Sequence, residues 1–327
     1  MKNQKRSGTG RLLALGLAAV LALGTLAGCG RQNRLMFGTG GTAGTYYSFG
    51  GVLSQYMTNY AGIKVTAVST GASKVNIESI SDGDYQLGFA QSDVMTYAWK
   101  GTRLFASGGA NREFRVLGAL YNETVQVITM NDKIKSVADL KGKSVSIGAA
   151  GSGVYFNAVD VLKAADISLD DIRPQYQSFE DSKESLKDGK IDAAFIVAGA
   201  PVTAITELAT TNGVKIVPID GPVRDRLLAD NKFYAAQTLP AGTYPKQNED
   251  IATVTIKATV LVSRKLDNDT VYKLTAAIFD HSQEIARENA KGRELSVTAA
   301  TQGIDVPFHA GAARYYAEHG VHVKTEE

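Results

Sequence analysis

Two hydrophobic spacings alternate along the chain. Short strand-like segments are found at 64–68 and 143–148, and 250–263 is a longer strand-like run with alternating stretches. Helical spacing is found at 155–162, at about 267–293 and 309–320, and in the run Phe49, Val52, Leu53, Tyr56, Met57 and Tyr60. Strands alternating with helices predict an α/β fold with a mostly parallel sheet covered by helices.

A glycine-rich loop joins the first predicted strand to the first predicted helix. It reads GTGGTAGTYYSFGG from Gly38 to Gly51 and follows the apolar pair Leu35-Met36. A glycine loop before a helix leaves backbone N–H groups and the positive end of the helix dipole free to meet an anion. The segment therefore predicts an anion site.

Two pairs of segments recur at nearly the same separation. SISDGDYQLGFA (79–90) aligns with SLKDGKIDAAFI (185–196), and GTAGTYY (41–47) aligns with GAAGSGV (148–154). Each half thus contains a strand, a glycine loop and a helix, and later a helix, an Asp-Gly turn and a strand. Ligands of such sheets lie beyond the carboxyl ends of the strands, so two facing lobes would place both glycine loops in one cleft.

The order of these units predicts an inserted second lobe. Its crossings lie near 120–125 and 250–255, and no third glycine loop follows. We expect 35–122 plus 255–327 to form the first lobe and 123–254 to form the second.

The N-terminal segment has the composition of a secretory signal. Four basic residues precede the uncharged apolar run 12–28, which is shorter than the roughly 20 residues of a membrane-spanning helix. Leu26-Ala27-Gly28-Cys29 resembles the lipobox of bacterial lipoproteins. That resemblance implies a signal peptide at 1–28, a lipid on Cys29 and a short tether at 29–34. The alternative is an ordinary cleavage site with an incidental free thiol, since Cys29 is the only cysteine.

Charge gives no indication of a nucleic-acid partner. Residues 1–28 hold four of the 35 basic side chains and none of the 33 acidic ones, so the remainder carries a net charge of −2.

Enzyme motifs are incomplete. Residues 38–43 match the dinucleotide pattern G-x-G-x-x-A, but the next predicted strand ends in Ser69-Thr70-Gly71 without the acidic residue that holds ribose. Neither glycine loop continues into the Lys-Ser or Lys-Thr of a Walker motif, and no G-x-S-x-G or H-E-x-x-H is present. All four histidines (281, 309, 319 and 322) lie near the C-terminus. We therefore expect no catalysis, cofactor or metal; a hydrolase using Ser152 or Ser92 is the remaining enzyme alternative.

Hydroxyl and amide side chains cluster at the predicted strand ends and helix starts. They either bind a ligand or cap helices. The set comprises Thr39, Thr42, Thr45, Ser69, Thr70, Ser73, Ser152 and Asn157, with Gln91-Ser92-Asp93 after the strand of the first Asp-Gly repeat.

Several segments resemble the TAXI family, the solute receptors of tripartite ATP-independent periplasmic (TRAP) transporters. They are GTGGTAGTYY, STGASKVNI, GFAQSD, DLKGKSVSIGAAGSG and HAGAARYYAEHG, which cover about residues 35–320 in order. The resemblance implies a type II periplasmic-binding-protein-like fold, with two hinge-linked lobes around a central cleft. It also implies a glutamate, glutamine or related dicarboxylate ligand and a TRAP permease as partner.

The family's binding segments map onto specific positions here. The resemblance implies that the following residues bind the ligand: Thr39, Gly40, Gly41, Thr42, Gly44, Thr45, Tyr46, Ser69, Thr70, Gly71, Asn76, Gln91, Ser92, Asp93, Tyr121, Ser152, Gly153 and Asn157. At the first crossing this chain has Tyr121-Asn122-Glu123 where the family often has Tyr-Pro-Glu.

These expectations describe an extracytoplasmic, lipid-anchored receptor that delivers a small carboxylate to an ion-driven permease. The alternative from a different transporter class is the binding protein of an ATP-driven importer. No arginine or lysine lies within the glycine loops, STGAS or QSD. We therefore expect backbone amides and hydroxyls to hold the carboxylate, with Arg115 or Arg173 as the competing candidates.

Overall fold

The computed structural model describes residues 34–326, which form ten strands and a set of helices. The predicted signal segment, Cys29 and nearly all of the tether lie outside the described residues. The strands are β1 (Arg34–Gly38), β2 (Lys64–Val68), β3 (Leu87–Gln91), β4 (Phe114–Thr129), β5 (Ser144–Ser146), β6 (Arg173–Gln175), β7 (Ala193–Ala198), β8 (Lys215–Val217), β9 (Ala235–Leu239) and β10 (Ile251–Ser263). The α-helices are α2 (Thr45–Ala61), α3 (Ser73–Asp82), α4 (Ser92–Lys100), α5 (Gly153–Ala164), α6 (Phe179–Lys187), α7 (Thr203–Thr211), α8 (Gly221–Asp230), α9 (Asn268–Phe279), α10 (Ser282–Glu288), α11 (Val297–Thr301) and α12 (Ala310–Glu318). Short 3-10 helices are η1 (Arg103–Phe105), η2 (Val137–Leu140), η3 (Leu169–Asp171) and η4 (Ala290–Glu294).

The strands of the described residues join one mixed sheet in the order β2-β1-β3-β10-β4-β7-β5-β6, with β8 beside β4 and β9 beside β10. Neighbours near the two ends are parallel, as in β1–β3 and β5–β7. The centre differs from the mostly parallel sheet that the alternating pattern predicts. There β10 is antiparallel to both β3 and β4, because β4 and β10 carry the chain in opposite directions between the two halves.

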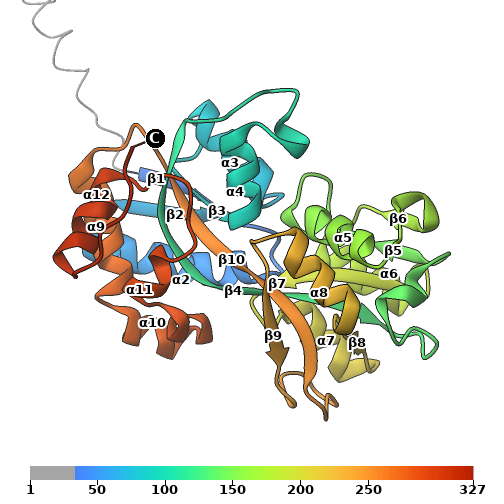
Figure 1. Ribbon diagram of the computed structural model, residues 1–327. Coiled ribbons are helices and arrows are strands. Elements are labelled where there is room, and N and C mark those ends of the chain that lie inside the picture. The colour runs from blue at the N-terminus through green and yellow to red at the C-terminus, as the bar shows by residue number, and fades with distance from the viewer. Residues whose placement is uncertain (1–33, 327) are drawn as a thin grey trace, which may run out of the picture. The chain divides into compact units, whose positions relative to one another are not determined.

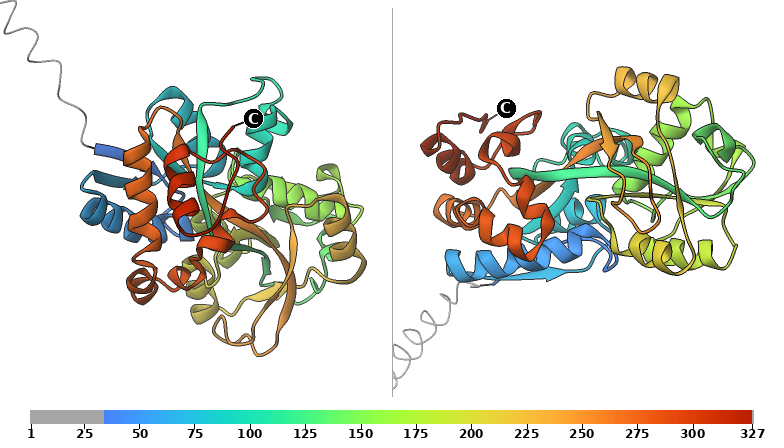
Figure 2. Two further views of the ribbon diagram at one scale, coloured as in Figure 1. Left: turned by 60° about the vertical axis from the view of Figure 1, so that its left-hand side comes forward. Right: turned by 90° about the horizontal axis from the view of Figure 1, so that it is seen from below.

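These two long strands connect two lobes (Figure 1; Figure 2, right). They pair through the middle, with Thr255 opposite Thr124 and Ala258 opposite Tyr121, and their register shifts just beyond Ala258. The buried clusters change at the same place: Tyr121 and Ala258 belong to one hydrophobic cluster, and Val125 and Ile256 belong to another. We propose the division expected from the sequence, at 122/123 and 254/255, as the boundary between first and second lobes.

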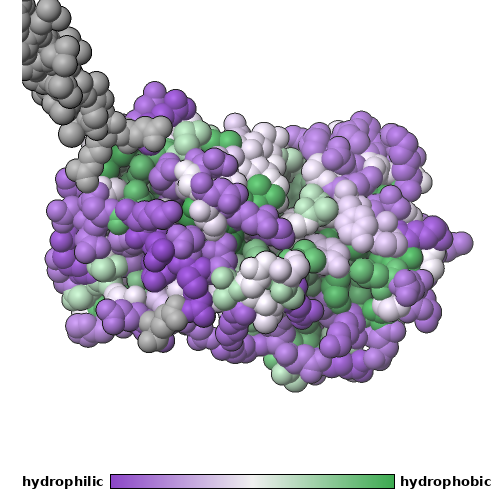
Figure 3. All heavy atoms as spheres, turned by 90° about the horizontal axis from the view of Figure 1, so that it is seen from above, coloured by the Kyte–Doolittle hydropathy of each residue, from purple (hydrophilic) through white to green (hydrophobic). Residues whose placement is uncertain are grey.

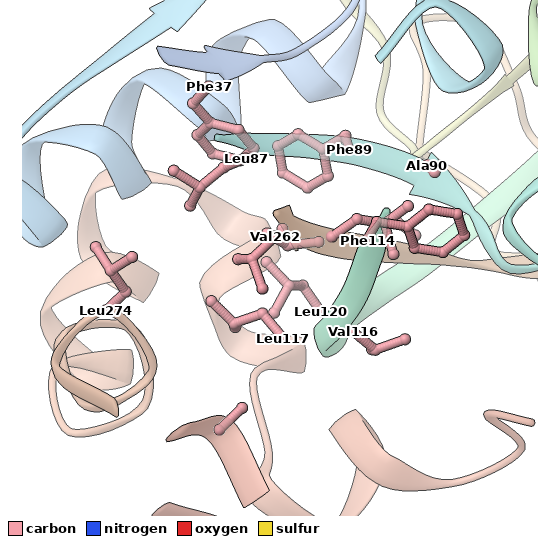
Figure 4. Packing of buried hydrophobic residues seen from close by; sticks show 14 of the residues in the cluster. Phe37, Leu87, Phe89, Ala90, Phe114, Val116, Leu117, Leu120, Val262 and Leu274 are labelled. Carbon is pink, nitrogen blue, oxygen red and sulfur yellow. The ribbon is translucent and has the colours of Figure 1, made fainter. Parts of the chain in front are cut away.

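The first lobe has the larger core. It contains Phe37, Leu87 and Phe89 from β1 and β3, together with Phe114 and Leu117 of β4, Val262 of β10 and Leu274 of α9, which are among the residues shown in Figure 4. Helices α9 to α12 lie with β1–β3 in this lobe, whereas α5 to α8 lie with β5–β8 in the second (Figure 1). Each lobe therefore has its own helix-covered part of the sheet.

The repeated segments form the elements that their pattern predicts. Helix α3 ends at Gly83, with a φ of 88°, before β3, and α6 is followed by Gly189, with a φ of 68°, before β7. The second half thus repeats the helix–turn–strand unit of the first.

The predicted helix at 267–293 is divided into α9, α10 and η4. The Asn289 side chain accepts a hydrogen bond from the Lys291 N–H and so caps η4.

The late HAGAARYY segment is a structural motif of the first lobe. His309 is the N-cap of α12 and accepts a hydrogen bond from the Gly311 N–H, at 3.2 Å. Its other ring nitrogen lies 3.0 Å from the Leu266 carbonyl oxygen. Tyr316, fully buried, donates to the Leu117 carbonyl at 2.9 Å. The motif therefore fastens α12 to β4 and to the chain before α9.

The face shown in Figure 3 is mostly hydrophilic, and polar residues interrupt its hydrophobic areas. Among the described residues, no helix has the length and apolar character needed to cross a bilayer.

Candidate ligand-binding site

The starts of five helices meet at one cavity of about 140 Å³ between the lobes. Helices α2, α3 and α4 come from the first lobe, and α5 and α6 come from the second. The lining residues are Gly40, Gly41, Gly44, Thr45, Tyr46, Thr70, Gly71, Ala72, Ser73, Gln91, Glu123, Ala149, Ser152, Gly153, Val154, Gln177, Ser178, Phe179, Val197 and Ala198. Both glycine loops thus share one cavity, as the repeat predicts, and the volume suits a ligand smaller than the drug-sized molecules of sites of about 300–1,000 Å³.

The first glycine loop forms one wall. Gly44 is the N-cap of the 17-residue helix α2, and no side chain caps the start of this helix. The first N–H groups of α2 are therefore available at the end of the helix that lines the cavity. The Thr45 hydroxyl donates to the Gly199 carbonyl at 2.8 Å, a contact between the lobes. The Tyr46 ring stacks on Phe89 with centroids 4.5 Å apart. Thr45 is therefore a contact across the cleft as well as a lining residue.

The loop between β2 and α3 is held by a buried amide. Asn76, with no exposed surface, donates through Nδ2 to the carbonyls of Thr39 and Phe89, at 2.7 and 2.8 Å. Thr70 Oγ1 lies 3.0 Å from the Thr39 carbonyl and accepts from the Ala72 N–H. These bonds fix the strand ends, so that Thr70, Gly71, Ala72 and Ser73 line the cavity.

The second lobe supplies the opposite wall. Ser152 is the N-cap of α5, is 5% exposed, and its buried hydroxyl has no partner among the described residues. Gln177 also has a buried side-chain oxygen without a partner there. Ser178 caps α6 by accepting from the Asp181 N–H at 3.1 Å. Buried polar atoms usually have partners, so the unpartnered atoms of Ser152 and Gln177 are available to a molecule that enters the cavity.

Gln91 bridges the two walls. Its side chain is 2% exposed, hydrogen-bonds Glu123, and leaves Oε1 without a partner among the described residues. A Cβ atom added at Gly153 would lie only 2.1 Å from this oxygen. The lobes therefore touch at Gln91 and Gly153 in the form that the structure describes.

The described lining contains one ionisable acid and no arginine or lysine. Glu123 of β4 is 2% exposed and accepts a hydrogen bond from the Tyr46 hydroxyl at 2.8 Å. Burial raises the pKa of Glu123 to about 8, although the bonds from Tyr46 and Gln91 oppose that shift. Arg115 donates to the carbonyls of Arg112 and Phe114, and Arg173 donates to that of Gly142. Neither competing arginine lies at the cavity.

Part of the predicted binding set supports the site rather than lining it. Thr39 donates to the Val68 carbonyl at 2.6 Å, Ser69 donates to the Gly40 carbonyl at 3.0 Å, and Thr42 is exposed. The residues of the set that do not line the cavity are Thr39, Thr42, Ser69, Asn76, Ser92, Asp93, Tyr121 and Asn157. The other residues of the set line the cavity: Gly40, Gly41, Gly44, Thr45, Tyr46, Thr70, Gly71, Gln91, Ser152 and Gly153.

Asp93 and Asn157 belong to a second contact between the lobes, which we call the interlobe cluster. It consists of Asp93, Tyr97, Arg103, Asn157, Asp160, Asn231 and Tyr234. Asn157 Nδ2 lies 3.2 Å from Asp93 Oδ2, and Arg103 pairs with Asp160 at 3.1 Å. Burial raises the pKa of Asp93 to about 7. The cluster joins α4 and η1 to α5 beside the cavity.

Glu123, Gln177 and Phe179 are absent from the predicted binding set. The internal repeat contains a signal for the last two, because the β6–α6 loop holds the place in the second half that the β2–α3 loop holds in the first. Glu123 lies in the first predicted crossing, but nothing in the local sequence indicates that it is buried at a cavity. Its burial depends on the pairing of β4 with β10 and on the contact with Tyr46.

A two-lobed α/β fold with a cavity between its lobes is the fold of periplasmic solute-binding proteins. Solved structures with this fold include a protein from Bordetella bronchiseptica RB50, 16% identical, with a TM-score of 0.54 and coverage of 87% of this chain and 89% of that one. Another is a binding protein component of an ABC phosphonate transporter from Pseudomonas aeruginosa, 13% identical, with a TM-score of 0.51 and coverage of 81% and 80%. At these identities the likeness concerns the fold alone. By sequence, the chain belongs to the NMT1-like family, which matches residues 37–320.

Proposed function

We propose that this protein is an extracytoplasmic solute-binding lipoprotein that captures a small carboxylate and delivers it to a membrane permease. The ligand class is a glutamate- or glutamine-like amino acid or a dicarboxylate. The observation that carries this proposal is the meeting of five helix starts at a cavity whose described lining has no cationic side chain. Partial positive charges and unpaired N–H groups at helix starts stabilise an anion there.

The cavity suits a carboxylate held by amides and hydroxyls. Gly40, Gly41 and Gly44 let the ligand approach the backbone closely, and the Ser152 hydroxyl is available to it. A hydrogen bond to a charged group contributes about 1.5–3 kcal/mol, so a few such bonds supply micromolar affinity without an arginine.

Capture requires the lobes to separate and close. The lining comes from both lobes, and the cavity is bounded by the contacts Gln91–Gly153 and Thr45–Gly199. A ligand that touches both walls favours the closed form over the open one, which shifts the population toward closure.

The TAXI resemblance supports a TRAP-type, ion-driven permease as the partner and Cys29 as the lipid anchor. The second candidate is the binding protein of an ATP-driven importer, which is supported by the similar fold of the binding protein component of an ABC phosphonate transporter from Pseudomonas aeruginosa. The two are distinguished by transport assays with the receptor and either a TRAP permease or an ABC permease from the same genome.

The hydrolase alternative has less support. Ser152 lines the cavity, but none of the four histidines in the described chain does, so the serine has no histidine base. The Ser92 side chain is not among the lining residues.

A thermal-shift screen of amino acids and organic acids tests the proposal. At a hundredfold excess over its dissociation constant a ligand adds about 2.7 kcal/mol to the free energy of unfolding. We expect small carboxylates to raise the midpoint and amines without a carboxylate to leave it unchanged. If no carboxylate binds while a neutral or cationic solute does, the proposal is wrong. Hydrolysis of model esters in the same preparation would favour the hydrolase.

A further inference from the structure

Glu123 is a carboxyl group inside a cavity that is otherwise arranged for an anion. It lies on β4 at the first crossing, where both lobes meet. Its Oε2 accepts from Tyr46 Oη at 2.8 Å, and the Gln91 side chain also bonds to it. The carboxyl is therefore held in place by residues of α2 and β3, and its position does not depend on a ligand.

The charges around Glu123 do not neutralise it. Tyr46 of α2 bonds to it, and in addition to burial the negative charge of Asp93 on α4 raises its pKa, so neither residue supplies a positive charge. Lys291 of η4 is the nearby cation. Burial has the larger effect on the pKa of Glu123 and raises it, whereas the charge of Lys291 lowers it. The Lys291 Nζ pairs with Glu294 at 2.6 Å and lies over the Tyr121 ring, outside the cavity lining.

A ligand carboxylate would place a second acidic group beside Glu123 in this enclosed space. Two carboxyl groups that share a site without a cation do not both ionise, and one of them keeps a proton. The ligand carboxylate sits at the helix starts, which favour its negative charge. Glu123 already has two hydrogen-bond donors that favour its ionised form, and burial still raises its pKa to about 8. Glu123 is thus the group that keeps the proton.

We propose that the site takes up its carboxylate ligand together with one proton, which resides on Glu123 and is donated in a hydrogen bond to the bound ligand. The proton comes from solvent when the lobes close, and it returns to solvent when they open. The inference rests on the proposed function, because it requires an anionic ligand in this cavity. Its consequence is that capture is favoured at lower pH and release at higher pH.

The experiment measures binding of glutarate and of L-glutamate by titration calorimetry between about pH 6.5 and 9 in buffers of different ionisation enthalpy. Above the pKa of Glu123 in the ligand-free protein, we expect wild-type Kd to rise about tenfold per pH unit, with uptake of close to one proton. Glu123→Gln retains the neutral hydrogen-bonding shape, so above about pH 8 its Kd should not vary with pH and its proton uptake should be absent. The comparison is made there because Asp93 of the interlobe cluster, with a pKa of about 7, is then ionised.

Glu288→Gln is the matched control, because Glu288 accepts from Tyr56 outside the cavity lining. It should behave as the wild type. Proton uptake by the wild type tests the inference even if Glu123→Gln does not fold. Binding without proton uptake anywhere in the range overturns the inference and leaves the proposed function standing. Proton release with L-glutamate, together with lost binding in Glu123→Gln, also overturns it, because Glu123 would then pair with the ligand's ammonium group. If neither carboxylate, nor any other, binds, both proposals are wrong.

Discussion

Adding one methyl group at Gly153 tests whether the lobes also meet at Gln91 and Gly153 when a ligand is bound. Gly153 is the first residue of α5, and a Cβ there would lie 2.1 Å from Gln91 Oε1 and 2.4 Å from Gln91 Cδ. Alanine is a better helix former than glycine, so α5 itself should accept Gly153→Ala. The perturbation therefore acts across the cleft and leaves the helix intact.

The size of the effect follows from what must move. Either the Gln91 side chain leaves its buried position and loses its bond to Glu123, or the lobes stop short of full closure. Loss of a hydrogen bond to an ionisable group costs about 1–3 kcal/mol, which corresponds to roughly 5- to 150-fold weaker binding. The unfolding midpoint of the ligand-free protein should change little, because the open form has no clash.

Calorimetric Kd values and ligand-free unfolding midpoints provide the measurement. Gly51→Ala is the matched control, because it adds the same methyl group within α2 where no atom lies within 4 Å. Gln91→Ala removes the clashing atoms, so the double variant with Gly153→Ala should bind no more weakly than Gln91→Ala alone. Wild-type affinity in Gly153→Ala would refute the reasoning, since the liganded lobes would then not meet at Gln91.

Three further predictions concern the cavity, the interlobe cluster and the C-terminal motif. Gly41→Val should reduce binding at least tenfold in calorimetry without lowering the unfolding midpoint, because a side chain at Gly41 meets no protein atom and lies at the cavity. Asp93 keeps its proton to a higher pH in the folded chain, with a pKa of about 7 against about 4 when unfolded, so the free energy of unfolding should fall as pH rises between these values. Asp93→Asn should flatten that fall in denaturant titrations at several pH values, and an unchanged slope would contradict the assignment. His309→Ala should lower the free energy of unfolding by about 0.5–2 kcal/mol through loss of the α12 cap, with unchanged ligand affinity.

The sequence could predict the architecture because its signals are local and repeated. Glycine loops, Asp-Gly turns and helical spacing each determine a short element, and their repetition places two of those elements on facing walls. The continuous sheet is harder to predict from the sequence, because the pairing of Thr124 with Thr255 joins positions more than a hundred residues apart. Only the assembled strands show that β4 and β10 cross together in opposite directions.

The candidate site could be predicted by segment but not by side chain. Asn76 in α3 and Gln91 at the end of β3 both belong to strand-to-helix junctions. The Asn76 side chain nevertheless points to the carbonyls of Thr39 and Phe89, whereas Gln91 points across the cleft. Which of them faces the ligand depends on side-chain direction, and sequence spacing contains no information about this.

The interlobe cluster implies that affinity is not a property of the cavity alone. Asn157–Asp93 and Arg103–Asp160 form between the lobes without lining the cavity, so they stabilise the closed form whatever the ligand. The apparent Kd of a closing receptor depends on the fraction of protein in the binding-competent state. A change at Arg103 would therefore alter the affinity for every ligand by the same factor, whereas a change at Gln91 or Glu123 would alter the preference among ligands. Tightness and selectivity can thus vary separately in this fold, because different residues control them.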